Sequence, residues 1–170
     1  MFYMLTELKD ILSNLEKTDT FKKWKSTHKN SFLSSFFIVD TQGWQLAFYS
    51  PSNKKMSTFL KDRLVQADSA IFKLKGEKVE ELNLEEVKID IEQAYEIADK
   101  ELEEKHPGYK PNKKIIVLQK LDGIAIWNIT YLTTSFYIYN VKIDASNKKI
   151  TFEDFTSALY SNPKKNPNLP

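Results

Sequence analysis

The sequence predicts an α+β fold made of two repeats of an amphipathic helix followed by an antiparallel β-meander. Two observations predict it. Leucines recur at helical spacing between Leu5 and Leu15, and a second helical stripe of apolar residues runs from Ile91 to Leu102. After each helix come short runs rich in aromatic and β-branched residues, separated by polar turn sequences, which is typical of antiparallel strands.

In the first half, the helical pattern covers about residues 4–26. Thr18, Asp19 and Thr20 offer a break and a new N-cap, so the end of this segment can be a separate short helix. The polar sequence DTQG at 40–43 predicts a tight turn between two strands. We expect the strands of this half at 32–39, 44–49 and 56–60, with a fourth apolar run at 70–74.

In the second half, residues 77–88 are acidic and form a connector or an edge strand. Asp90 can cap the next helix, with Gln93 completing a capping box, and His106 to Gly108 end it. Alternating apolar residues and the Asp122–Gly123 turn then predict strands at 115–121, 124–131, 137–143 and 150–155.

The element order of the two halves matches when Gly43 is set against Gly123, which suggests an internal duplication. We therefore predict one unit at 1–76 and another at 77–160. The Pro-, Asn- and Lys-rich segment 161–170 is expected to be a disordered tail.

The second half, about 88–155, resembles a PepSY domain. The resemblance lies in IDIEQAYEIADKELEEKHPGY, then IAIWNITY, then FYIYNVKIDASNKKITF. It implies a PepSY- or cystatin-like fold and a non-catalytic module. Such domains accompany secreted or membrane-linked proteins, including protease propeptides, for which a role in regulating peptidases has been proposed. The family has no catalytic residues to carry over.

Composition excludes several kinds of chemistry. The chain has no Cys and only 4 Gly, so it has no thiol catalysis and no Gly-rich phosphate loop. His28 and His106 lack ligand spacing, and we expect no metal, no cofactor and no enzymatic activity. Only one of 25 basic residues is Arg, which does not favour nucleic acid as a partner. The start has no signal peptide and no apolar run reaches the length of a membrane span, so a cytoplasmic protein is expected.

The function predicted from these features is binding or regulation of another protein, with a peptidase as the candidate partner, through a sheet face or a strand edge. Segment 64–104 holds 13 acidic against 5 basic residues and can steer a basic partner. The partner and the oligomeric state are left open. The alternative is a cystatin-like or NTF2-like small-ligand binder or enzyme with an apolar pocket. The candidate binding residues are strand tyrosines for the pocket and glutamates for steering: Tyr131, Tyr137, Tyr139, Glu80, Glu81, Glu85 and Glu86.

Overall fold

The computed structural model describes residues 5–71 and 78–159, which form three α-helices, one short 3-10 helix and eight strands. The helices are α1 (Leu5–Lys17), α2 (Asp19–Thr27) and α3 (Ile91–Lys105), with η1 at Leu84–Glu86. The strands are β1 (Phe32–Val39), β2 (Gln45–Ser50), β3 (Lys55–Leu60), β4 (Arg63–Ala70), β5 (Pro111–Leu121), β6 (Ile124–Thr133), β7 (Tyr137–Asp144) and β8 (Ile150–Ser157). No described helix is long and apolar enough to cross a membrane.

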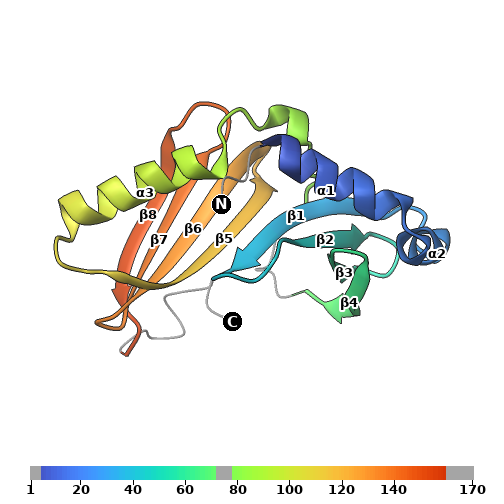
Figure 1. The fold of residues 1–170 in the computed structure, drawn as a ribbon, viewed down its shortest axis with the longest axis horizontal. Helices are drawn as coiled ribbons and strands as arrows, with labels where there is room; N and C mark the ends of the chain where they lie inside the picture. The colour runs from blue at the N-terminus through green and yellow to red at the C-terminus, as the bar shows by residue number, and fades with distance from the viewer. Residues whose placement is uncertain (1–4, 72–77, 160–170) are drawn as a thin grey trace.

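All eight strands belong to one antiparallel sheet in the order β4-β3-β2-β1-β5-β6-β7-β8. Each half contributes a four-stranded meander, and β1 and β5 join the meanders at the centre of the sheet. Figure 1 shows the helices on one side of this sheet, with α3 across the β5–β8 part and α1 along β1. The main core lies between the helices and the sheet, and its largest fully buried side chains include Phe36, Leu118, Trp127, Tyr131 and Tyr139.

The predicted fold class is wrong. The chain does not form two repeats that each consist of one helix and its own small meander. The molecule is dominated by a single continuous sheet, and its first half carries two helices instead of one. The helices separate at Thr18, whose Oγ1 accepts a hydrogen bond from the Phe21 amide and caps α2. The repeat prediction failed because helix and turn signals are local, whereas the pairing of two meanders is decided between residues far apart in the chain.

The junction between β1 and β5 has a simple physical reason. Each strand is the first of its meander and would otherwise present a row of unpaired backbone groups. Five residue pairs, from Ser35 opposite Gln119 to Val39 opposite Ile115, satisfy them. On the helix side, this pairing places Phe36 opposite Leu118, both fully buried. One core therefore runs across the junction.

The start of α3 is as predicted. The Asp90 carboxylate accepts a hydrogen bond from the Gln93 amide, and the Gln93 side chain accepts one from the Asp90 amide, which completes the capping box. Ala94 and Ala98 are fully buried, so their small side chains let α3 lie close to the sheet.

Three other sequence predictions have different outcomes. The fourth strand of the first half is β4 at Arg63–Ala70 instead of 70–74, of which 72–74 lie outside the described residues. Residues 78–88 form a connector rather than an edge strand. The predicted tail at 161–170 lies outside the described residues.

The turn between β7 and β8 is held by the carboxylate of Asp144, which accepts hydrogen bonds from the amide and hydroxyl of Ser146 and from the amide side chain of Asn147. Burial by itself raises the pKa of Asp144, but these hydrogen bonds and nearby Lys149 outweigh it, so the pKa lies below its ordinary value. The charged form is therefore favoured by folding.

We expect Asp144→Asn to lower the free energy of unfolding by about 1–3 kcal/mol at pH 7, because the Asn side chain has no charge and replaces one of the two acceptor oxygens by an NH2 donor. Since the folded pKa is the lower one, this stabilisation is fully present above the unfolded pKa of about 3.9 and is lost as pH falls through the folded value. Urea unfolding of both proteins from pH 7 to pH 2 measures it. Asp122→Asn, in the exposed β5–β6 turn, is the control and should change little. A deficit of Asp144→Asn that stays constant into strong acid would contradict this account.

Candidate binding surfaces

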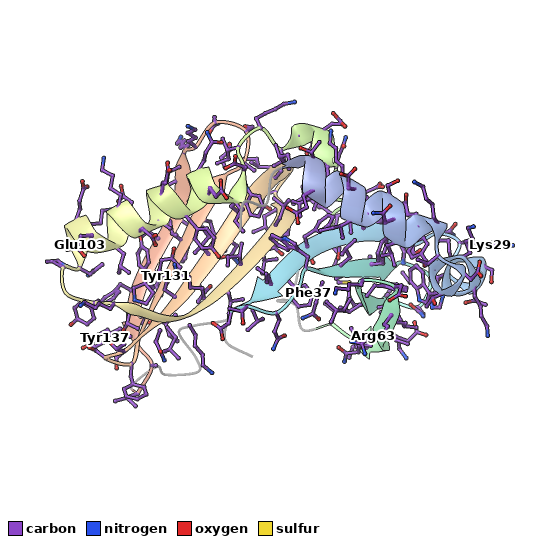
Figure 2. The ribbon with its side chains drawn as sticks, viewed as in Figure 1. Lys29, Phe37, Arg63, Glu103, Tyr131 and Tyr137 are labelled. Atoms are coloured by element: carbon purple, nitrogen blue, oxygen red, sulfur yellow. The ribbon has the colours of Figure 1, made fainter. Side chains whose placement is uncertain are left out.

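Two of the candidate tyrosines, Tyr131 on β6 and Tyr139 on β7, lie in the core. They are cross-strand partners and both are 0% exposed. Tyr131 donates its hydroxyl hydrogen to Asp99 Oδ1 on α3 at 2.6 Å, and Tyr139 donates to Glu153 Oε1 on β8 at 3.0 Å. Figure 2 shows Tyr131 between α3 and the sheet. The rings fill the space between helix and sheet in which a ligand pocket was expected.

Tyr137 lies apart from this pair, at the end of the sheet near the C-terminus of α3. Its ring stacks on Phe155 with centroids 4.9 Å apart and meets Tyr109 edge-on at 5.0 Å. His106, the C-cap of α3, stacks on the same Phe155 at 3.8 Å. Packing between aromatic rings therefore accounts for Tyr137, and whether it also binds a partner stays a prediction.

The environment of the buried tyrosines has a measurable consequence. Burial, followed by the hydrogen bond to a carboxylate, raises the pKa of both Tyr131 and Tyr139 above the ordinary value. Burial and the charge of Asp99 raise the pKa of Tyr95 to about 12. The neutral forms stabilise the fold below the unfolded pKa of about 10, and this contribution is lost as pH rises towards the folded values.

We expect these three of the 8 tyrosines to stay neutral in the native protein at about pH 11 and to ionise at higher pH as the protein unfolds. Tyrosinate absorbance followed beside far-UV circular dichroism tests this. The variant Tyr131→Phe should leave the early, native-state absorbance change unaltered and reduce only the late one. A smaller early change in Tyr131→Phe would show that this hydroxyl ionises in the folded state.

The four candidate glutamates come together along the connector of residues 78–88. Both oxygens of Glu80 accept from the Gly123 amide in the β5–β6 turn, at 3.1 and 3.2 Å. That turn needs Gly123, because its φ of +80° is strained for other residues. Glu85 pairs with Lys9 of α1 at 2.6 Å, and Glu86 pairs with Lys120 of β5 at 2.8 Å.

These three glutamates thus tie the connector to α1, β5 and the β5–β6 turn. The hydrogen bond and charge of Lys9 lower the pKa of Glu85. Glu81 is exposed. An open groove of about 720 Å³ runs between α1 and the connector. All four candidate glutamates line it, together with Lys9, Leu12, Ser13, Glu16, Lys78 and Lys120. Steering of a basic partner by these carboxylates stays a prediction.

Binding through a sheet face was predicted from the sequence, but the residues of that face were not. We call the face that carries none of the described helices the open face (Figure 1). Because side chains alternate along a strand, Phe36 and Ile38 enter the core while Phe37 and Val39 point to the open face. Phe37 is paired with Val117, and Val39 with Ile115, so four apolar residues form one patch over the β1–β5 junction. Figure 2 shows Phe37 on the side of the sheet away from α3.

The open face holds three of the large exposed hydrophobic residues of the described chain, namely Ile115, Ile124 and Phe152, each about 40% exposed. Beside the apolar patch lies a polar cluster, in which the Asn140 amide donates to Asn128 Oδ1 at 2.7 Å and to Thr130 Oγ1 at 2.8 Å. The sequence did hold a signal for this face. Residues 36–39 and 115–118 are continuously apolar instead of alternating, which indicates strands with apolar side chains on both faces.

Among residues 5–71 and 78–159, no three or more His, Asp or Glu side chains are grouped so that they could hold a metal ion. His28 and His106 lie at the C-termini of different helices.

The chain matches no family model and no curated protein sequence. Among solved structures it is similar to a chain from Clostridium difficile 630 described as a "putative lipoprotein", with 16% sequence identity and a TM-score of 0.48, covering 84% of this chain and 98% of that one. A likeness at this level carries no argument about function.

Proposed function

We propose that this protein is a non-catalytic binding or regulatory module that acts by contacting another protein through the open face of its sheet. The observation that supports this most is the apolar patch of Phe37, Val39, Ile115 and Val117, on a face that none of the described helices covers. Ile115 is exposed and the other three side chains are half-buried, and contiguous apolar surface on a monomeric protein often marks an interaction site when it is large.

The composition of the patch fits a protein partner. An apolar centre beside satisfied polar groups is the usual anatomy of a protein interface, with contacts at the rim that fix register. The Asn128, Thr130 and Asn140 cluster supplies such a rim, because its members are already hydrogen-bonded to one another and cost little to cover. A peptidase as the kind of partner rests on the PepSY-like pattern of residues 88–155 and is part of the proposal.

The test is affinity capture from a lysate of the native host with three forms of the protein. We expect a protein that is retained by the wild type and by Glu96→Lys, on the exposed side of α3, but is lost with Ile115→Lys, because a charge in the patch must be desolvated on binding. Circular dichroism shows whether each variant is folded. Equal retention by all three forms would contradict the proposal, and a metabolite that raises the melting temperature would favour the pocket alternative.

A further inference from the structure

The two outer strands of the sheet differ in how well they could accept another strand. The pairing of β4 with β3 has two register shifts, between Met56 and Phe59, and Asp68 on β4 has a φ of +49°. The Asp68 carboxylate also contacts His28, the C-cap of α2, and accepts from Asn53. Such irregularities protect an edge strand from further pairing.

The other outer strand, β8, is more regular. It extends over eight residues without Pro or Gly, and its one register irregularity lies near its start. Among the residues that the structure describes, no strand pairs with its outer edge. In an antiparallel sheet, alternate residues of such a strand direct their backbone N–H and C=O groups outward. This edge is therefore a template for an added strand.

A second copy of the chain is a poor occupant of this edge. Glu153 and Asp154 are adjacent at the middle of β8. When two β8 strands pair antiparallel about a two-fold axis at one of these two residues, a carboxylate lies opposite its own copy on the same face of the sheet: Glu153 on Glu153, or Asp154 on Asp154. Like charges directly opposite destabilise a strand pair. A partner strand that is basic avoids this repulsion.

The two carboxylates have different roles. Glu153 faces the helix side, where it accepts from Tyr139 and pairs with Lys105. Asp154 lies on the open face, where its neighbour two residues away is the 40% exposed Phe152. Residues of an added strand opposite Phe152 and Asp154 are also two apart and share their face.

From this geometry we infer that the outer edge of β8 takes up an extended segment of another protein, which carries a Lys or Arg two residues from an apolar residue. The backbone pairing supplies affinity, the basic side chain meets Asp154, and the apolar side chain covers Phe152. The inference about β8 deepens the proposed function and rests on one part of it, namely that the protein works by contact with a partner protein. The β8 edge is a different surface from the apolar patch over the β1–β5 junction.

The experiment uses a synthetic peptide of about ten residues, long enough to span β8. Every second residue is threonine, and the positions between are valine and lysine in turn, so that each lysine lies two residues from a valine. Its binding is followed by the amide signals of the isotope-labelled full chain. We expect the β8 amides to shift, and affinity to fall about tenfold or more both for Asp154→Lys and for a peptide with glutamate in place of lysine. Gln66→Lys, at the corresponding face of β4, is the matched control and should bind as the wild type does.

A second test leaves the protein unchanged and alters the peptide. Methylation of those backbone nitrogens of the peptide that face β8 removes the hydrogen-bond donors of the added strand, so the methylated peptide should not bind. Absence of binding, shifts confined to other strands, or equal affinity for Asp154→Lys and wild type would overturn the inference. If the peptide fails to bind β8 but the host partner is lost with Ile115→Lys, the proposed function stands and the inference about the β8 edge falls. If the peptide binds β8 while Ile115→Lys retains every partner, the open-face proposal falls and the edge remains.

Discussion

Replacing Trp127 by Ala is expected to lower the free energy of unfolding by about 3–5 kcal/mol. The ring is 1% exposed on the helix side of β6, and its Nε1 donates to the carbonyl of Ile89 at 3.0 Å. Ile89 lies just before α3, and its amide donates to the carbonyl of Ala145 after β7. Trp127 thus packs where the connector, α3 and the sheet meet, and its loss leaves both a cavity and an unpaired carbonyl.

Equilibrium unfolding in urea, followed by far-UV circular dichroism, measures this effect. Trp127→Phe keeps an aromatic ring in the core but removes the hydrogen bond to Ile89, so it measures the contribution of that bond, which should be about 1–2 kcal/mol. Ile124→Ala, at the exposed start of the same strand, is the matched control, with an expected change within about 0.5 kcal/mol. A loss below about 1 kcal/mol for Trp127→Ala would mean that the residue does not anchor this part of the core.

Phe36→Ala at the β1–β5 junction is expected to cost a similar 3–5 kcal/mol and to weaken both halves of the protein together. Phe36 is fully buried on β1, and its cross-strand partner Leu118 belongs to the other meander. Because the sheet and its core are continuous across this pair, we expect one cooperative unfolding transition.

Native-state hydrogen exchange distinguishes this from two independent units. In Phe36→Ala the slowest amides of β1–β3 and those of β5–β7 should lose protection by the same free energy. Val39→Ala, three positions further along β1 and on the opposite face of the sheet, should have a much smaller effect on both halves. If the β5–β7 amides kept their wild-type protection in Phe36→Ala, the halves would be separate folding units.

Elements defined by neighbouring residues could be predicted from the sequence, because their signals are local. The capping box of Asp90 and Gln93, the turn at Asp122 and Gly123 and the break at Thr18 each depend on a few adjacent side chains and the backbone groups beside them. Seven of the eight strands were found where apolar and aromatic residues ran between turn sequences, and the largest shift of an end is at β5, which begins at Pro111 instead of residue 115. The fourth strand of the first half was misplaced because Arg63–Ala70 is polar, as an exposed edge strand can be.

The candidate sites were less predictable, since the sequence does not show what a polar side chain will meet. Tyr131 and Tyr139 were chosen for their hydroxyl groups, yet Asp99 and Glu153 satisfy those hydroxyls within the protein. Three of the four chosen glutamates hold the connector in place.

By itself, then, the sequence determined the antiparallel strands, the capped helix α3 and the lack of thiol and phosphate-loop chemistry, because these follow from residue type and short-range spacing. Only the tertiary structure decided that β1 pairs with β5, that one face of the resulting sheet lies open, and that β8 rather than β4 is the regular edge. Strand pairing depends on hydrogen bonds between backbones, which are nearly the same for every residue. No local pattern therefore specifies which strand becomes whose neighbour, and the surfaces proposed for binding arise only from that choice.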